Sequence, residues 1–485
     1  MKLLNIKMIA HILGLLLIIN SLFIALCIPF ALAHQEEAWK PLVLSFFVNA
    51  AVGFAAFWGT RSARNKSLKK RDGLVIVTVG WLTMSLFATL PYLFSGAISS
   101  FTDAFFETVS GYTTTGASIL NNIEELPVGI LTWRSMTQWI GGMGIIVLTV
   151  AIFPLLGIGG IQLFSAESPG LSPDKLKPRI TDTAKRLWLI YLGLTLAETI
   201  LLMFGGMSFT EAFNHSLTTL ATGGFSTKQD SVAFYTSPYI QYVIIFFMFM
   251  AGTNFSMTYL LFHGKIKQVL RNEEFRVYGL MTIAVTAAVF LVVLQFDPVW
   301  EKAFRDSLFQ IVSIVTTTGY VTADYSQWGG FALLIIFLLM FVGASAGSTA
   351  GGVKIIRHVI LVKNSLLELK RQLHPHGVLP VRVNGKAISS HVTFNVLAFM
   401  IVYLIIFGVG TLLMAMTGAD FMTAIGSVAT SLGNIGPGLG TVGPVDNFAH
   451  LSDVAKWLLS FMMLLGRLEL FTVILIFSPV FWKDY

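Results

Sequence analysis

The sequence contains very little cysteine and very little charge. Among its 485 residues there is one cysteine, Cys27, and only 12% of residues are charged, whereas 55% are hydrophobic. A single cysteine excludes an intrachain disulfide, and without a Cys/His cluster in the sequence there is no tetrahedral zinc site. The scarcity of charge, with a mean hydropathy of +0.76, excludes a soluble globular chain and predicts an all-α integral membrane protein in a lipid bilayer.

Apolar stretches long enough to span a bilayer, about 20 residues, occur ten times. We predict spans near residues 8–30, 42–60, 73–97, 129–157, 187–206, 237–262, 277–296, 329–352, 391–417 and 454–480. The first ends in Ala31-Leu32-Ala33 and so resembles a signal peptide. Its apolar run of about 25 residues is longer than a secretory core of about 7 to 15, which favours an uncleaved span.

Basic residues indicate the topology. Of the 32 Lys and Arg residues, all but seven lie near the chain ends or in alternate connections, at 61–71, 175–186, 265–276 and 354–386. The positive-inside tendency places these connections and both termini in the cytoplasm. The net charge of +7 therefore reports topology, and we predict no nucleic-acid partner.

The connections on the opposite side contain a fourfold repeat. Ser100–Phe105 and Ser208–Phe213 are nearly identical, and the acid in each precedes a glycine by 13 residues. The same spacing separates Asp306 from Gly319 and Asp420 from Gly433. Gly436, Gly438 and Gly440 are competing choices for the last copy, and we select Gly433 because it preserves the spacing. The four runs comprise Thr113, Thr114, Thr115 and Gly116; Ala221, Thr222, Gly223 and Gly224; Thr316, Thr317, Thr318 and Gly319; and Thr430, Ser431, Leu432, Gly433 and Asn434.

A repeat period near 100 residues indicates four copies of one module. We place two extra N-terminal transmembrane helices at 1–72 and the modules at 73–160, 183–264, 275–357 and 388–485. Each module contains a half-length segment, near 104–113, 212–221, 307–316 and 421–430, which is too short to cross the bilayer. These segments predict re-entrant helices around a pseudo-fourfold pore, with an acid at each helix start and the negative dipole ends at a shared aqueous path.

The runs that follow these helices predict a selectivity filter. Their backbone carbonyls can replace the hydration shell of a monovalent cation, and they contain no carboxylate of the kind that calcium or magnesium would require. A helix C-cap is the simpler explanation for any one run, but four runs in matching context favour a filter.

Four span, pore-loop, span modules with one glycine per run resemble the Trk/Ktr/HKT superfamily of potassium transporters, and within it the membrane subunits of bacterial Trk uptake systems. The resemblance covers nearly the whole chain. It implies a potassium-channel-like fold, potassium bound at the filter carbonyls as substrate, and no cofactor in this chain. It also implies a homodimer in the bacterial inner membrane and a cytosolic nucleotide-binding regulatory subunit similar to TrkA. In this superfamily a serine at the first filter glycine accompanies sodium permeation, so Gly116 favours potassium.

Two features near the filter leave alternatives open. The small residues 343–352 fit either close helix packing or an intramembrane loop that obstructs the pore, and the resemblance favours the loop. Arg467, within the last span, either pairs with Glu469 or Glu198 or contacts this loop as a fixed positive charge. The predicted gate comprises Gly343, Gly347, Ser348, Thr349, Gly351, Gly352, Lys354 and Arg467.

Missing motifs restrict the function further. The sequence has no P-loop and no dinucleotide fingerprint, so nucleotide control would belong to another chain. The basic segment 364–386 is either the surface on which that other chain docks or an ordinary linker. An enzyme is not expected, because away from the ends of the spans only Arg467, Glu198 and Glu469 are charged. A symporter coupled to protons or sodium is the alternative, although such transporters commonly use inverted repeats and these four repeats enter from one side.

Overall fold

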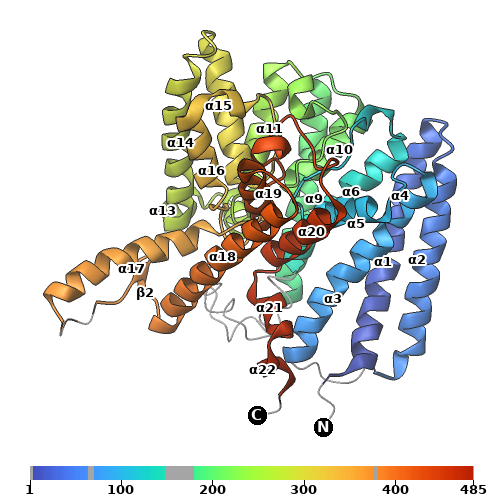
Figure 1. Cartoon of the computed structure of the whole chain (residues 1–485), viewed down its shortest axis with the longest axis horizontal. Helices are drawn as coiled ribbons and strands as arrows, with labels where there is room; N and C mark the ends of the chain where they lie inside the picture. Colours follow the sequence, from blue (N-terminus) through green and yellow to red (C-terminus); the bar gives the residue numbers. More distant parts are fainter. Residues whose placement is uncertain (1–3, 64–69, 148–179, 376, 378, 484–485) are drawn as a thin grey trace.

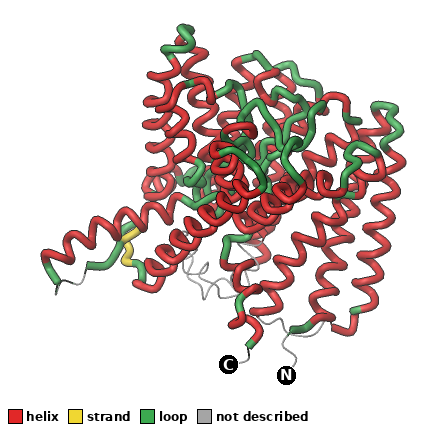
Figure 2. The backbone as a smooth tube through the Cα atoms, in the orientation of Figure 1, coloured by secondary structure: helices red, strands yellow, loops and turns green. Residues whose placement is uncertain are grey.

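The computed structural model describes residues 4–63, 70–147 and 180–483, apart from residues 376 and 378. Helices dominate this part of the chain, and its sheet consists of two short strands (Figure 2). The prediction of an all-α protein is confirmed. The predicted span 129–157 is described only as far as Val147, and residues 64–69 and 175–179 of the basic connections lie outside the described residues.

Two long helices form a hairpin at one edge of the molecule (Figure 1): α1 (Ile6–Ala33) and α2 (Trp39–Gly59), followed by the 3-10 turn η1 (Arg61–Ala63). They approach closely because glycines face each other. A β-carbon at Gly53 would lie 2.9 Å from the carbonyl oxygen of Gly14. Glu36, in the connection, accepts hydrogen bonds from the amides of Val128 and Gly129 at 2.7 and 3.2 Å and so attaches the hairpin to the next unit.

Four helical units follow along the chain. The first contains α3 (Lys70–Ala88), α4 (Leu90–Ser95), α5 (Phe101–Tyr112), η2 (Ile123–Glu125) and α6 (Val128–Val147). The second contains α9 (Ile180–Phe204), α10 (Phe209–Leu220), η5 (Ser231–Phe234), α11 (Pro238–Ala251), α12 (Phe255–Phe262) and α13 (Ile266–Arg271). The third contains α14 (Glu273–Val293), α15 (Trp300–Val315), η6 (Tyr325–Gln327), α16 (Gly329–Leu339) and α17 (Ile355–Leu373). Strands β1 (Arg382–Val383) and β2 (Lys386–Ala387) precede the fourth, which contains α18 (Ser390–Met416), α19 (Phe421–Gly433), η7 (Gly440–Val442), α20 (Asp453–Arg467), α21 (Phe471–Phe477) and α22 (Pro479–Trp482).

Six spans within the described residues are long and apolar enough to cross a membrane: α1, α2, Arg71–Ser95 (α3 with α4), Lys185–Phe204 of α9, α14 and α18. Three predicted spans are not continuous helices. The predicted span 237–262 is the pair α11 and α12, bent by 110°, and 454–480 is the pair α20 and α21, bent by 118°. The predicted span 329–352 begins with the 11-residue helix α16 and continues as a loop. The chain is nevertheless a multi-pass membrane protein.

Local chemistry explains both bends. Asn254 starts α12 as its N-cap, accepting a hydrogen bond from the amide of Ser256 at 2.8 Å, so the α11 helix stops at the preceding glycine, Gly252. After α20, Glu469 and Leu470 have φ angles of 57° and 46°, which a right-handed helix cannot accommodate. Hydropathy averaged over a whole predicted span does not reveal these bends, because the neighbours of the few residues that cause them are apolar.

The glycine contact in the hairpin predicts the effect of enlarging its interface. Gly53→Val is expected to lower the apparent melting temperature of the purified protein, by an overpacking cost of about 1–3 kcal/mol, because the new side chain meets the backbone of α1. Gly59→Val, at the end of the same helix where a β-carbon would meet nothing within 4 Å, is the matched control. Equal melting temperatures for the two variants would contradict this packing.

Candidate functional site

The short helices α5, α10, α15 and α19 all end in the same turn. Each is followed by a residue in the left-handed region: Thr114 at φ 51°, Thr222 at 54°, Thr317 at 54° and Asn434 at 54°. In the first, the amide of Thr114 donates to the carbonyl of Gly111 and the amide of Thr115 to that of Ser110, both at 2.9 Å, which is a Schellman C-cap. Left-handed backbone costs a residue other than glycine about 1–2 kcal/mol and is rarest for β-branched residues, and such strain concentrates at functional sites.

Two residues beyond each turn lies a glycine, and the four glycines form a closed ring. We call Gly116, Gly224, Gly319 and Gly436 the glycine ring; their φ angles are 82°, 74°, 79° and 107°. A β-carbon at Gly116 would lie 2.2 Å from the carbonyl oxygen of Gly223, one at Gly224 2.0 Å from that of Thr318, one at Gly319 1.8 Å from that of Ile435, and one at Gly436 2.8 Å from that of Thr115. Each run therefore contacts the next, the fourth contacts the first, and only glycine fits.

The structure corrects the predicted register of the fourth run. Gly433 and the preceding predicted residues, Thr430, Ser431 and Leu432, lie in the last turn of α19, and Gly436 occupies the ring. The acid was the wrong reference point. Asp420 is itself the N-cap of α19, whereas in α5 and α10 a serine is the N-cap and the acid is the third helical residue. Measured from the cap, the distance is sixteen residues in each case: Ser100 to Gly116, Ser208 to Gly224 and Asp420 to Gly436.

The prediction that an acid lies at the start of each short helix is also wrong in the third unit. Asp103 and Glu211 lie in the first turns of α5 and α10, but α15 begins at Trp300, so Asp306 lies in its second turn. There it forms an ion pair with Lys302, at 3.8 Å. A hydropathy pattern cannot place this start because Trp300–Arg305 is partly polar.

Side chains from neighbouring units brace the glycine ring. Gln138 of α6 donates to the carbonyl of Gly223 at 2.6 Å and accepts from the amide of Phe225 at 3.1 Å. Asn434 donates to the hydroxyl of Thr115 at 3.0 Å. Gln138 was not predicted from the sequence, where it is one of several polar residues within the predicted span 129–157.

Glu107 of α5 and Arg134 of α6, 2.7 Å apart, form a buried ion pair next to the first run. Glu107 also accepts from the amide of Ile119 at 3.0 Å, and Arg134 donates to the carbonyl of Ser226 at 2.9 Å. This pair was not predicted from the sequence, although its acid belongs to a repeat. Nine residues before each ring glycine stands a buried polar residue: Glu107, His215, Gln310 and Ser427.

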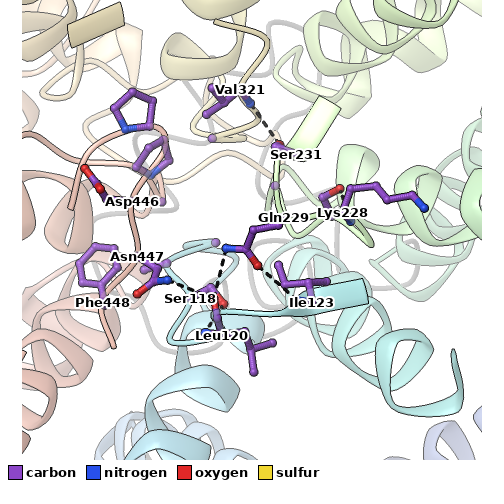
Figure 3. A pocket seen from close by; sticks show the side chains of 18 of the residues that line it. Ser118, Leu120, Ile123, Lys228, Gln229, Ser231, Val321, Asp446, Asn447 and Phe448 are labelled. Carbon is purple, nitrogen blue, oxygen red and sulfur yellow. Dashed lines mark hydrogen bonds between the residues drawn. The ribbon is translucent and has the colours of Figure 1, made fainter. Parts of the chain in front are cut away.

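On one side of the glycine ring lies an open pocket, lined by all four ring glycines and by loops from all four units. Figure 3 shows hydrogen bonds that join these loops, from the Ile123 amide to Gln229 at 3.2 Å and from Asn447 to the Leu120 carbonyl at 3.2 Å. Among its charged residues, Arg134 is paired as above, and Lys228 is 3.1 Å from Glu211. Burial favours a higher pKa for the Glu211 carboxyl, but hydrogen bonds from Lys228 and Ser208 outweigh it and hold the pKa below its ordinary value. Both basic groups are thus neutralised, which leaves the pocket accessible to a cation.

On the other side of the ring lies a loop, 340–354, between α16 and α17, whose central residues 343–352 are all small. The predicted residues 343–352 therefore form a loop, and the helix-packing alternative is wrong. The loop contacts the ends of the short helices directly. The Gly351 amide donates to the hydroxyl of Thr317 at 2.6 Å, and the hydroxyl of Thr349 donates to the carbonyl of Leu220 at 2.9 Å. The predicted Lys354 donates to the Ala350 and Gly351 carbonyls.

The same loop fills the bend between α11 and α12. The Ser345 amide donates to the Gly252 carbonyl at 3.0 Å, Asn254 donates to the Ala346 carbonyl at 2.6 Å, and the Phe255 amide donates to the Gly347 carbonyl at 3.1 Å. Gly347 (φ 71°) must be glycine because a β-carbon would lie 2.9 Å from the Asn254 side chain. The loop and the broken helix satisfy each other's backbone groups.

Arg467, at the end of α20, is 2% exposed and contacts this loop. It donates to the carbonyl of Thr349 at 2.8 Å and to that of Gly141 on α6 at 3.0 Å. In the described chain it pairs with neither predicted acid, and Glu469 pairs with Arg357 of α17 instead. The ion-pair alternative for Arg467 was therefore wrong, and the loop contact is present.

The described residues of the predicted basic segment 364–386 form the end of a helix and two short strands. Helix α17 continues to Leu373 and projects from the body of the molecule, with the two strands beside it (Figure 1). Asn384, at the turn between the strands, accepts from the amide of Glu273 at 2.7 Å, which attaches this turn to the start of α14.

The chain is similar over its full length to characterised transport proteins. A family model described as TrkH, cation transport protein, matches residues 40–483. The Trk system potassium uptake protein TrkH of Salmonella typhimurium is 40% identical, and TrkG of Escherichia coli is 34% identical, with 99% of each chain covered in both comparisons. The crystal structure of the potassium transporter TrkH from Vibrio parahaemolyticus superimposes with a TM-score of 0.91 at 37% identity, covering 99% of this chain and 100% of that one.

The family model spans most of the chain, and the relatives exceed 30% identity over nearly all of it. The fold, the four short helices with a common end and the full-length similarity agree with one another. The chain therefore belongs to the TrkH family of cation transport proteins.

Proposed function

We propose that this protein takes up potassium across the bacterial inner membrane through a channel-like path that passes through the glycine ring. The relatives named above are potassium uptake proteins, and the proposal extends that activity to this chain. The observation that carries it is the closed contact cycle of four equivalent runs. Backbone carbonyls that gather in such a ring replace the hydration shell of a cation.

The backbone of the runs supports this role. Left-handed residues alternate with residues of negative φ, as at Thr113 (−74°) and Thr114 (51°), and this alternation turns successive carbonyls toward the same side. The filter would consist of residues 113–116, 221–224, 316–319 and 433–436, with potassium as cargo and no cofactor.

The loop 340–354 is the proposed gate. It lies against the ends of three short helices, and a β-carbon at Gly351 would lie 2.8 Å from the carbonyl oxygen of Gly433. A cation leaving the ring on this side meets the loop and the positive charge of Arg467, which pairs with no acid among the described residues. The two carbonyl bonds of Arg467 hold the loop in this position.

Partners and location follow the same proposal. The relatives belong to Trk systems, whose name implies further subunits. For this chain we propose a homodimer, cytoplasmic termini and a TrkA-like nucleotide-binding subunit that opens the gate. The projecting helix α17, which begins directly after the gate, is the segment through which such a subunit can act.

Flux into proteoliposomes tests the transport activity. Purified protein should admit rubidium faster than sodium or lithium without an imposed proton gradient. Flux that requires a proton or sodium gradient would favour coupled symport, and equal rates for all three ions would contradict a selective ring.

The ring itself predicts a position-specific effect. Gly116→Ser or Gly436→Ser should raise the sodium-to-rubidium flux ratio by about tenfold, the order expected for losing about 1–2 kcal/mol of cation coordination, because the new side chain displaces a neighbouring carbonyl. Gly408→Ser on α18, where a β-carbon meets nothing within 4 Å, is the control. A ratio unchanged from wild type in both ring variants would exclude the filter assignment.

The gate predicts that neutralising Arg467 increases basal flux. Arg467→Gln removes the charge and weakens the bonds to Thr349 and Gly141, so rubidium flux in the absence of any partner should rise several-fold, whereas Arg467→Lys should remain near wild type. Arg276→Gln, an exposed arginine of α14, controls for lost charge. A folded Arg467→Gln protein with wild-type flux would refute the gate role.

A further inference from the structure

The N-terminal hairpin carries buried polar side chains that lead to the first filter run. Asn20 of α1 and Asn49 of α2 are both fully buried, and Asn20 donates to the Asn49 side-chain oxygen at 3.0 Å. Asn49 in turn donates to the carbonyl of Ser45 at 2.9 Å. The side-chain oxygen of Asn20 accepts a hydrogen bond from the hydroxyl of Tyr112 at 2.5 Å. Such a network is costly at membrane depth unless its members satisfy one another, and here they do.

Tyr112 is the last residue of α5 and directly precedes Thr113, the first residue of the run. It is held at both ends. Its hydroxyl bonds to Asn20, and its carbonyl packs against Gly141, where a β-carbon would lie 1.9 Å from the carbonyl oxygen. The ring of Trp81 on α3 meets the tyrosine ring edge-on, with centroids 6.4 Å apart.

The other three units have no counterpart to this tyrosine. The equivalent positions, two residues before the left-handed residue, are occupied by the buried apolar residues Leu220, Val315 and Leu432. In the part of the chain that the structure describes, the first run is thus the one tied by a side-chain hydrogen bond to a helix outside the four units. The hairpin is held in place by close glycine packing between α1 and α2 and by Glu36, which caps the start of α6.

We propose that the α1–α2 hairpin positions the first filter run through the Asn49–Asn20–Tyr112 hydrogen bonds, and that Tyr112 is a positioning residue for ion selectivity. The inference rests on the proposed filter. Thr114 has the same left-handed conformation as Thr222 and Thr317, whose runs lack this tyrosine, so the turn itself does not require the hydrogen bond. The hydrogen bond instead fixes where the end of α5 lies, and without it the carbonyls of the first run lose their spacing relative to the other three.

The test compares Tyr112→Phe, Asn20→Leu and the double variant in proteoliposomes, measuring the sodium-to-rubidium flux ratio and the melting temperature. Each single variant should raise the ratio about fivefold, the order expected for one hydrogen bond. The double variant should show no larger change than either single variant, since both remove the same bond. Tyr112→Phe deletes one oxygen atom, so it decides the outcome if Asn20→Leu does not fold.

Two controls make the result specific. Tyr403→Phe removes a buried hydroxyl that has no hydrogen-bond partner among the described residues, and it should leave the ratio unchanged. Gly116→Ser reports whether the ring governs selectivity at all. A lowered melting temperature with a wild-type ratio in Tyr112→Phe would overturn the proposal and leave the hairpin a structural element, provided Gly116→Ser shifts the ratio. An unchanged ratio in Gly116→Ser would overturn both this proposal and the filter.

Discussion

A backbone carbonyl inside a membrane protein must find a partner, because lipid offers none. In this chain that constraint is most severe where four helices end at a common ring. The Schellman turns satisfy the last helical carbonyls, and the alternation of left-handed and right-handed residues then directs further carbonyls toward neighbouring runs. Each ring glycine is required because a β-carbon would lie 1.8–2.8 Å from a carbonyl oxygen of the next run. Carbonyls gathered at such density attract a cation.

Much of the surrounding structure satisfies the same requirement. Gln138 of α6 bonds to the second run, Asn434 joins the fourth run to the first, and the Glu107–Arg134 pair holds the segment that follows the first ring glycine. In the loop 340–354, the Thr349 hydroxyl donates to the last carbonyl of α10, and the Gly351 amide donates to the Thr317 hydroxyl just after α15. The loop also forms hydrogen bonds with the backbone groups at the break between α11 and α12. Larger side chains would keep the loop backbone away from these partners, which explains why residues 343–352 are small.

The sequence predicted the fold class, and internal similarity predicted three of the four glycines that form the ring. It failed in the fourth because the spacing was measured from the acid, and Asp420 is a helix cap whereas Asp103 is not. Averages of hydropathy concealed the bends after Ala251 and Arg467, since two or three residues decide them. Arg467 stood out as a charge in an apolar segment, but its partners are backbone carbonyls, which no residue pattern reveals. Asn20 and Asn49 were overlooked for a similar reason: each is a single polar residue, and only the fold brings both near Tyr112.

A cation bound at the glycine ring through backbone carbonyls can be located with a heavier analogue of potassium. Anomalous diffraction from crystals of this protein grown in rubidium or thallium salts should show a peak on the ring axis, within coordination distance of carbonyl oxygens from all four runs. The peak should weaken when sodium replaces the heavier ion. Anomalous peaks only at the protein surface, with none at the ring, would show that the ring does not bind the cation.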